Sequence, residues 1–395
     1  MKQKLMAIAV AGALAAPALA FAQGSTVQIY GSIRIDYNFV DQGAGRLNVD
    51  GFSRYDSYIG FRGEEKLGGG MSAWFQCEST LDVTGQPGAT GDPQGLCERN
   101  SAVGLKGSFG NIFAGHWDTP FKQAHGGFFR PFSTVGAFGI SSQLMNGIAG
   151  NTINGGDAAG DGNRLSFSRR QANTINYASP SWGGVTVMGA FSSADESTAT
   201  VIPAATGKPR LLSFGTTYRS GPVNLGAGFE RHKNYNPGQV ATGLGAAQYS
   251  GGDDDAWSIA GAYTFGNFKL GAIYMRTEYE TSNTTKLVNK GWGVYGDWKI
   301  AGPHSLRLGY TVADDTSGAF VGNLGNYRGN AGAGGTGSRL LGLQYAHALS
   351  KRTELNLGYV KLSNERNSRH VIQSLPVRNV GQDQSAFVMG VRHSF

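Results

Sequence analysis

The sequence predicts an all-β protein, a transmembrane antiparallel β-barrel of about sixteen strands whose long third loop folds into the lumen. Segments of alternating apolar and polar residues recur along the chain, and short turns between them alternate with long polar connections. After the first twenty-two residues, no apolar run approaches the ~20 residues that a membrane helix needs. The composition agrees, because 62 glycines and 11% aromatic residues suit a large closed sheet with tight turns.

The N-terminus has the features of a secretory signal peptide. Lys2 and Lys4 give a basic start, a largely apolar run follows, and Ala20-Phe21-Ala22 fits an A-x-A cleavage site. The run is too short for a membrane anchor, and no stop-transfer cluster of charges follows it. We therefore expect residues 1–22 to be cleaved off and residues 23–395 to form the barrel domain.

The clearest strand is the first one after the signal peptide. From Val27 to Phe39, apolar and polar residues alternate with period two, which is typical of a strand with one apolar and one polar face. The segment is longer than most strands of soluble sheets and suits a tilted membrane-spanning strand of roughly 9–11 residues plus a rim. Similar alternation recurs downstream, for example in a segment from Arg164 to Tyr177.

The connections and the polar faces together favour a closed, water-filled barrel. Short connections such as Glu65–Gly70 alternate with long ones such as Asp314–Thr336. Lipid offers no partner to backbone groups, so a sheet in a bilayer must close on itself. A barrel of this size leaves an aqueous channel, and the inward-facing residues include no apolar set that would fill it. A soluble β-sandwich, the alternative, has fewer and shorter strands.

One connection is much longer than the others and runs from about Asp118 to Asn163. Such a loop with its own apolar cluster usually has a function or folds onto something. Inside a wide barrel the available place is the lumen, and we expect the loop, which carries Lys122 and Arg130, to narrow the channel. Its large apolar and proline residues are Pro120, Phe121, Phe128, Phe129, Pro131 and Phe132.

Several runs carry a family resemblance: Val27–Gly31, Tyr58–Gly70, Gln76–Glu78, Arg99–Lys106, Gly115–Pro120, Asn173–Pro180 and Val391–Phe395. They resemble the Gram-negative general diffusion porins, the trimeric outer-membrane porins, especially their β-proteobacterial branch. The resemblance spans the whole chain after the signal peptide and is strongest over residues 23–190 and the last strand.

The resemblance implies a homotrimer in the cell outer membrane, in contact with lipid and lipopolysaccharide, through which small hydrophilic solutes diffuse passively and without a cofactor. A terminal aromatic on the lipid side matches the family's assembly signal, which assigns that role to Phe395. Barrel-assembly machinery and periplasmic chaperones are then the partners during biogenesis.

The resemblance also implies a constriction where basic groups on the wall face acidic groups. Arg99 matches the family's eyelet arginine, Glu78 matches its wall glutamate, and Arg164 lies near the arginine at the end of the long loop. The chain departs from the pattern at Tyr58, which replaces an arginine, and at Gly115-His116-Trp117, which replaces Gly-Arg-Gln. The predicted basic group is Arg54, Arg99, Arg164 and Arg170, and the predicted acidic group is Glu78 and Asp118.

Charge on the inner face predicts a weak anion preference, because rings of basic side chains favour the entry of anions. Wall networks that select nothing are one alternative, and a substrate-specific channel that uses the phenylalanines of the long loop is another. The inward-facing basic residues are Arg34, Arg54, Arg62, Lys106, Arg164, Arg170, Lys269, Lys299, Arg307 and Arg392. The inward-facing acidic residues are Asp36, Asp56, Glu64, Glu78, Asp297 and Glu354.

Other motifs give no sign of catalysis or of a metal. Cys77 and Cys97 flank the second long loop, and the oxidising periplasm allows either a disulfide or two free thiols. No H-E-x-x-H or G-x-S-x-G motif is present, so an enzyme is not expected. We interpret Asp253-Asp254-Asp255 as a solvated loop and Gly332–Gly337 as a loop before a strand. The lumenal basic excess makes no case for nucleic acid.

Overall fold

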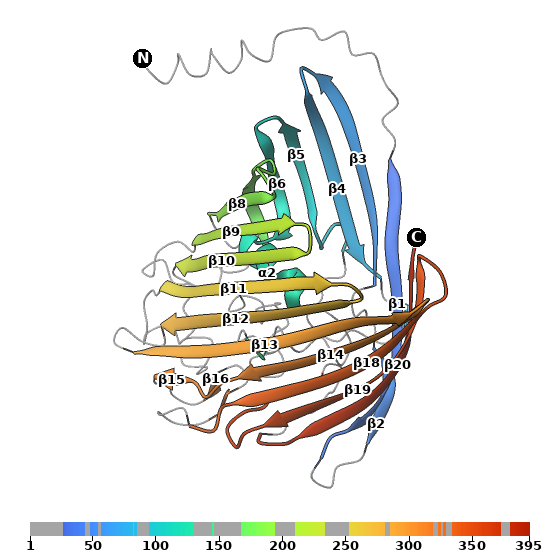
Figure 1. The fold of residues 1–395 in the computed structure, drawn as a ribbon. Coiled ribbons are helices and arrows are strands. Elements are labelled where there is room, and N and C mark those ends of the chain that lie inside the picture. The colour runs from blue at the N-terminus through green and yellow to red at the C-terminus, as the bar shows by residue number, and fades with distance from the viewer. Residues whose placement is uncertain are drawn as a thin grey trace.

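The computed structural model describes residues 27–43, 48–53, 57–81, 83–84, 95–129, 144–145, 167–193, 210–233, 253–280, 285–318, 323–324, 327–328, 334–372 and 380–395. Sixteen long antiparallel strands form the wall of the barrel (Figure 1). They are β1 (Gln28–Asp41), β3 (Tyr58–Gly68), β4 (Met71–Thr80), β5 (Ser101–Gly107), β6 (Gly110–Asp118), β7 (Arg170–Ala178), β8 (Val185–Ser192), β9 (Arg210–Ser220), β10 (Val223–Lys233), β11 (Asp253–Phe265), β12 (Phe268–Glu280), β13 (Lys286–Ala301), β14 (His304–Ala313), β18 (Ser338–Ala348), β19 (Thr353–Asn364) and β20 (Gln384–Ser394).

A few short elements complete the described chain. The strand β2 (Val49–Ser53) pairs with the second half of β1, and β3 pairs with its first half. The two strands together therefore form the neighbour of β1 along this edge. The strand β15 (Ser317–Gly318) pairs with the start of β13, whereas β16 (Asn323–Leu324) and β17 (Tyr327–Arg328) form a separate hairpin. The helix α2 (Pro120–Phe129) follows β6.

The sheet closes where the last strand pairs with the first. The strand β1 bonds to β2 and β3 along one edge and to β20 along the other. At the end of this seam the amide of Gly31 donates to the carbonyl oxygen of Phe395 at 3.2 Å, and the amide of Phe395 donates to that of Gly31 at 3.1 Å. The C-terminus accordingly lies beside β1 in Figure 1. The predicted closed barrel of sixteen strands is confirmed.

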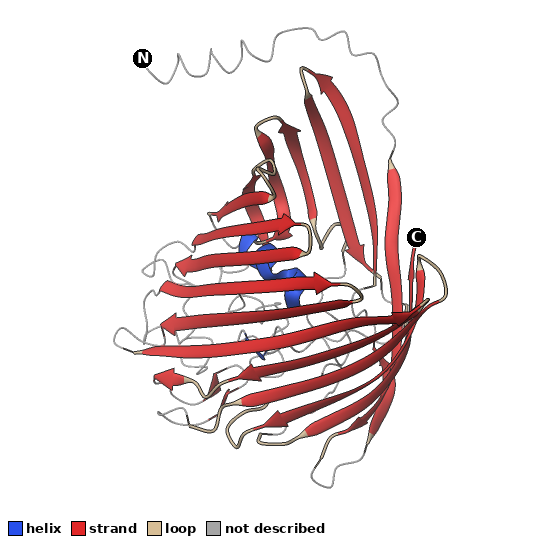
Figure 2. Ribbon diagram, in the orientation of Figure 1, coloured by secondary structure: helices blue, strands red, loops and turns tan. Residues whose placement is uncertain are grey.

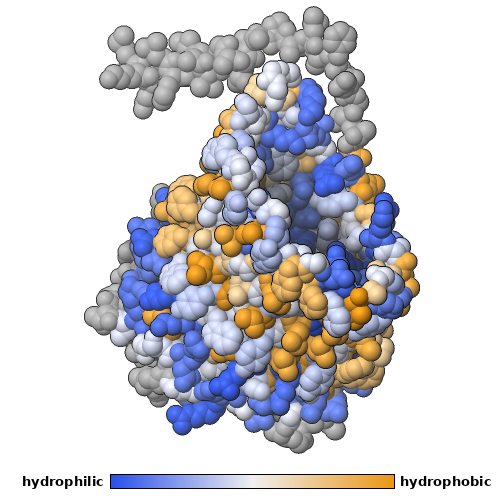
Figure 3. Space-filling model, in the orientation of Figure 1, coloured by the Kyte–Doolittle hydropathy of each residue, from blue (hydrophilic) through white to orange (hydrophobic). Residues whose placement is uncertain are grey.

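The two faces of the wall differ as the alternation predicts. On β11, Ile259 is 55% exposed on the outer face, whereas its neighbour Ser258 is 1% exposed and points inward. Successive side chains of a strand point to opposite faces, so this alternation repeats along the wall. Apolar residues gather on the outer surface in Figure 3, and hydrophilic residues surround the hollow near the top of that view.

The turns at one end of the barrel are short and use glycine where the backbone demands it. Gly266 joins β11 to β12 with φ 56°, and Gly302 joins β13 to β14 with φ 53°. Two-residue hairpin turns need positive φ, which glycine adopts without steric cost. The longer connections join strand ends at the other end of the barrel, as the sequence predicts.

The start of β7 and the start of β11 differ from expectation. The sequence predicts a strand from Arg164, but β7 begins at Arg170, and Phe167 is fully buried instead of facing lipid. The Asp253-Asp254-Asp255 run is not a loop, because it forms the first residues of β11. In both places tertiary contacts decide where the strand begins, and the alternation alone does not show them.

No helix among the described residues is long and apolar enough to cross a membrane. They also contain no group of three or more histidine, cysteine or acidic residues that could hold a metal ion.

The seam gives a test of closure. A Cβ atom at Gly31 would lie 2.5 Å from both the Phe395 ring and the carbonyl oxygen of Tyr58, so Gly31→Val must push apart the strands that close the barrel. We expect its free energy of unfolding to fall by about 1–3 kcal/mol, the usual cost of overpacking. Guanidinium unfolding of refolded protein measures this. Gly51→Val on β2, where a Cβ meets nothing within 4 Å, is the control. Equal stability of the two variants would contradict the role of the seam.

Candidate pore constriction

The helix α2 begins the long third connection and lies on the inner face of the wall. The amide of Phe121 donates to Ser213 Oγ on β9 at 2.9 Å, and Phe121 is fully buried. Gly226 on β10 lacks a side chain where the carbonyl of Ala124 meets it, so the helix backbone rests directly on the strand. Ser213 and Gly226 belong to the inward-facing parity, and Figure 2 shows the helix inside the ring of strands.

His125 fixes the middle of this helix. Its Nδ1 lies 3.0 Å from Ser258 Oγ on β11, and its Nε2 lies 2.7 Å from Ser168 Oγ, near the end of the same connection. Burial, with a smaller contribution from Lys122, lowers the pKa of His125 to about 3. The ring is therefore neutral at physiological pH and joins both ends of the long loop to the wall.

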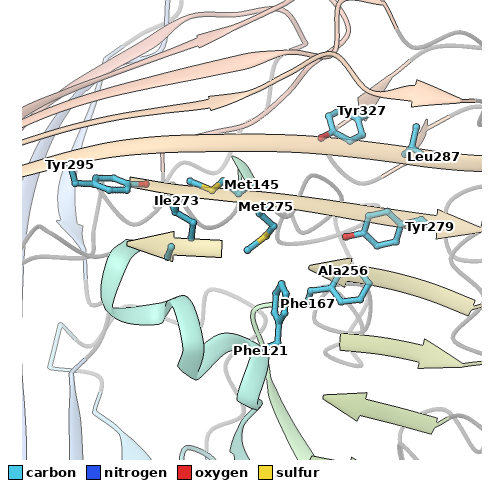
Figure 4. Close-up of a cluster of buried hydrophobic side chains, with 11 residues drawn as sticks. Phe121, Met145, Phe167, Ala256, Ile273, Met275, Tyr279, Leu287, Tyr295 and Tyr327 are labelled. Atoms are coloured by element: carbon cyan, nitrogen blue, oxygen red, sulfur yellow. The ribbon is translucent and has the colours of Figure 1, made fainter. Parts of the chain in front are cut away.

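An apolar cluster lies beneath the connection, on a part of the inner face that the sequence analysis expected to be polar. Phe167 stacks on His232 of β10 with ring centroids 4.4 Å apart, and Asn289 Nδ2 of β13 donates to the carbonyl of Met145 at 2.6 Å. Figure 4 shows the cluster beside α2. Its buried members are Phe121, Met145, Phe167, Ala256, Ala260, Ile273, Met275, Tyr279, Leu287, Tyr295 and Tyr327.

The signal for this cluster was present in the sequence. Ile273, Met275 and Tyr295 are apolar residues at inward-facing positions of β12 and β13, and such a patch requires a cover. The described parts of the connection supply that cover. Residues 130–143 and 146–166 lie outside the described chain, so the narrowing of the channel by them stays a prediction.

Three of the predicted constriction residues meet in one ion-pair cluster. Asp118 Oδ1 lies 2.6 Å from Lys122 Nζ and 3.3 Å from Arg170 Nε. Asn100 completes the cluster, because its Nδ2 donates to Asp118 Oδ2 at 3.1 Å and its Oδ1 accepts from Arg170 Nε at 3.1 Å. Asn100, whose amide can serve both charges, is not among the residues predicted from the sequence.

Arg99 directly precedes Asn100 of this cluster in the sequence, and its neighbour Glu78 belongs to β4. The amide of Arg99 donates to the carbonyl of Glu78 at 3.0 Å, and the Arg99 guanidinium lies 5.2 Å from the centre of the Tyr58 ring. Arg99 precedes β5, which begins at Ser101, so its loop position frees it from the strand's alternation. The Tyr58 ring, at a position where the resemblance implies an arginine, therefore supports the Arg99 side chain. Arg54, Arg130 and Arg164 lie outside the described residues.

A disulfide between Cys77 and Cys97 closes the base of the second long connection. The two Cα atoms are 4.7 Å apart, and the amide of Cys97 donates to Ser79 Oγ at 2.9 Å. Cys97 adopts a left-handed conformation with φ 65°. The bridge ties the residues just before Arg99 to β4, so it helps to fix where Arg99 and Asn100 stand.

A belt of charged side chains crosses the inner face on the opposite part of the wall. Cross-strand register places Lys269 beside Asp297, Asp297 beside Arg307, Glu354 beside Arg392, and Arg392 beside Arg34. Arg307 joins the two halves, since its Nη atoms donate to both carboxylate oxygens of Glu354 at 3.1 Å. Directly opposed residues are close enough to interact. The belt therefore holds four basic and two acidic groups in one network.

Comparisons with known proteins agree with this architecture. The family model described as Gram-negative porin matches residues 7–367. The chain belongs to the Gram-negative porin family. Outer membrane porin protein 32 of Delftia acidovorans is 26% identical over the whole of both chains. The monosaccharide porin of a Halomonas species is 24% identical over 84% of this chain and 88% of its own.

Solved porin structures share the fold. The anion-selective porin from Comamonas acidovorans superposes with a TM-score of 0.69 at 22% identity, over 94% of this chain and all of its own. The trimer form of OmpT from Vibrio cholerae gives 0.62 at 15% identity, over 94% of this chain and all of its own. This porin is therefore an outer-membrane channel for passive diffusion and not an enzyme.

The Asp118 cluster predicts a shift in ion selectivity. Asp118→Asn keeps the shape and the contact to Asn100 but removes the negative charge that offsets Lys122 and Arg170. We expect the chloride-to-potassium permeability ratio to rise by roughly 1.5- to 2-fold, because screening limits partly exposed charges. The reversal potential in a salt gradient across a planar bilayer measures the ratio. Asp41→Asn, which removes an exposed charge at the outer end of β1, should leave it unchanged. A ratio that falls would contradict the assignment.

His125 predicts a dependence of stability on pH. Its pKa in the folded protein is lowered to about 3 from an ordinary value of 6.5, so below pH 6.5 the unfolded chain binds a proton that the folded chain does not. Folding stability should then fall by about 1 kcal/mol per pH unit from pH 6.5 toward pH 3. Guanidinium unfolding at pH 7.5 and pH 5.0 measures the loss, which should be smaller in His125→Gln. An equal loss in both proteins would rule out His125 as its source.

Proposed function

We propose that this porin passes small hydrophilic solutes and ions with a weak preference for anions. The observation that carries the proposal is the inner belt, which has four basic and two acidic groups. Fixed positive charge on a channel wall raises the local concentration of anions and lowers that of cations. The relative from Comamonas acidovorans is an anion-selective porin, which supports the same sign.

We propose further that Arg99 and Glu78 form the wall side of the constriction, opposite the long loop. Arg99 is held from two sides, by the backbone bond to Glu78 and by the Tyr58 ring. Asp118, Lys122 and Arg170 offset one another and position the loop as it leaves β6. The sequence adds Arg54 and Arg164 to the basic side and Arg130 to the loop.

We propose that the porin is a homotrimer embedded in outer-membrane lipid and lipopolysaccharide. The outer face of β1 and β20 exposes Ile29, Phe39, Phe387 and Met389, an apolar surface suited to lipid or to another copy. The OmpT structure in its trimer form supports this assembly. Light scattering of the detergent-solubilised protein tests it, and a monomer mass would contradict it.

We also propose that residues 1–22 are removed on export and that Phe395 serves as the assembly signal for the barrel-assembly machinery, after periplasmic chaperones have delivered the chain. The sequence supports the cleavage site, and the aromatic Phe395 on the outer face of the closing seam supports the signal. Amino-terminal sequencing of the mature protein should begin at Gln23.

A substrate-specific channel is the second candidate, and one observation favours it. Trp74, Phe113 and Trp117 form an aromatic cluster on the inner wall, with ring centroids 5.1–5.8 Å apart. The sequence suggests such a surface on the phenylalanines of the long loop instead. Trp117 lies four residues after Phe113 on β6, so simple alternation places both on the same face.

Recording in a planar bilayer tests the function and its sign together. The purified porin should give stepwise conductance, and the reversal potential should show chloride above potassium. Arg392→Gln removes one basic group of the belt and should lower the permeability ratio by roughly 1.5- to 2-fold. Arg276→Gln, on the outer face of β12, is the matched control. Absence of conductance steps would contradict the channel function, and a cation preference in the wild type would contradict the proposed anion preference.

A further inference from the structure

A recess of about 390 Å³ opens on the inner wall near the end with the short turns. Residues of four adjacent strands line it: Gln28 of β1, Arg62, Gly63 and Glu64 of β3, Trp74, Phe75 and Gln76 of β4, and Lys106 of β5. All of them except Gly63 and Phe75 occupy inward-facing positions, and cross-strand register places Arg62 beside both Gln28 and Gln76 and Glu64 beside Trp74. The recess therefore belongs to the lumen and lies away from the long loop.

Positive charge dominates this recess. Glu64 is bound from two sides, by Lys106 at 2.5 Å and by Lys66 at 2.9 Å, so two cations share one carboxylate. Arg62 adds a third positive charge without an acidic partner of its own among these residues. Its Nε donates to Gln28 Oε1 at 2.9 Å, and its guanidinium lies 4.7 Å from the centre of the Tyr30 ring. These two contacts hold Arg62 in place and use only one of its five N–H donors.

A fixed aromatic surface stands beside these charges. Trp74 lines the recess, and its Nε1 donates to Asn111 Oδ1 at 2.7 Å, which sets the orientation of the indole. The rings of Phe113 and Trp117 pack against the indole of Trp74, with ring centroids 5.4 and 5.8 Å from its own. The flat face of the Trp74 indole thus lies near the Arg62 guanidinium. Neither ion passage nor barrel stability requires this combination.

We propose that this recess binds small aromatic monocarboxylates on their way through the channel. The carboxylate pairs with the Arg62 fork, which matches its planar geometry, and with the ammonium of Lys106. The aromatic ring of the solute packs on Trp74. Glu64 repels a second negative charge on the solute, which weakens the binding of dicarboxylates. A neutral solute gains no binding energy from the Glu64 carboxylate. The proposal deepens the porin function and rests on it, because the recess is reached through the open lumen.

Benzoate is the probe, and ligand-detected NMR titration of the detergent-solubilised porin measures its binding. We expect a Kd on the order of 1–10 mM, as suits a solute that must leave again. Arg62→Gln and Lys106→Gln should each raise Kd by about tenfold, the loss of one charge-assisted contact. Trp74→Leu should raise it by roughly 3- to 10-fold. Arg219→Gln removes an inward arginine of β9 near the same end of the barrel and should change Kd less than twofold.

Two chemical controls separate the parts of the proposal. Benzamide keeps the ring without the charge, and acetate keeps the charge without the ring, so each should bind at least tenfold more weakly than benzoate. Equal binding of acetate and benzoate, or no effect of Arg62→Gln, would overturn the recess as the site. Channel steps in potassium chloride are recorded on the same samples. Steps without benzoate binding refute this inference alone, whereas the absence of steps refutes the porin function itself.

Discussion

The structure depends on one constraint, the closure of the sheet by β20 against β1. Every backbone N–H and C=O group in the hydrocarbon region needs a partner within the protein, and an open edge would leave a row of them without one. The mutual bonds between Gly31 and Phe395 end the seam. Closure then requires an even number of antiparallel strands, tight turns at one end, and a wall whose faces alternate between lipid and lumen.

The wall was therefore predictable from the sequence, and what covers its inner side was only partly so. Period two shows which residues share a face, so Ile259 outside and Ser258 inside were assigned without coordinates. The same alternation places Ile273 and Met275 inside, where they look misplaced in a water-filled lumen. Packing by α2 and Phe167 explains them. Such contacts join residues more than a hundred positions apart, and no local pattern records them.

The candidate constriction was likewise predictable from the sequence only in part. Family resemblance pointed to Arg99, Glu78 and the run that contains Asp118, whereas Arg170 was assigned from its inward-facing parity. The resemblance did not indicate Asn100, whose importance lies in standing between Asp118 and Arg170. Nor did it assign a role to Tyr58, which appeared only as a departure from the pattern. Side chains that support a charge are chosen by geometry, and many residue types can do it.

Ion selectivity in such a lumen comes from the charges that the wall leaves uncompensated. Arg307 illustrates compensation, because it forms ion pairs with Glu354 and Asp297, which balance its charge within the wall. Asp118 is compensated in the opposite sense by two cations. Positive charges also stand side by side where Arg392 and Arg34 share a register. At physiological salt a charge is felt over about 8 Å, so such local excesses act on a passing ion more than the net charge of the chain does.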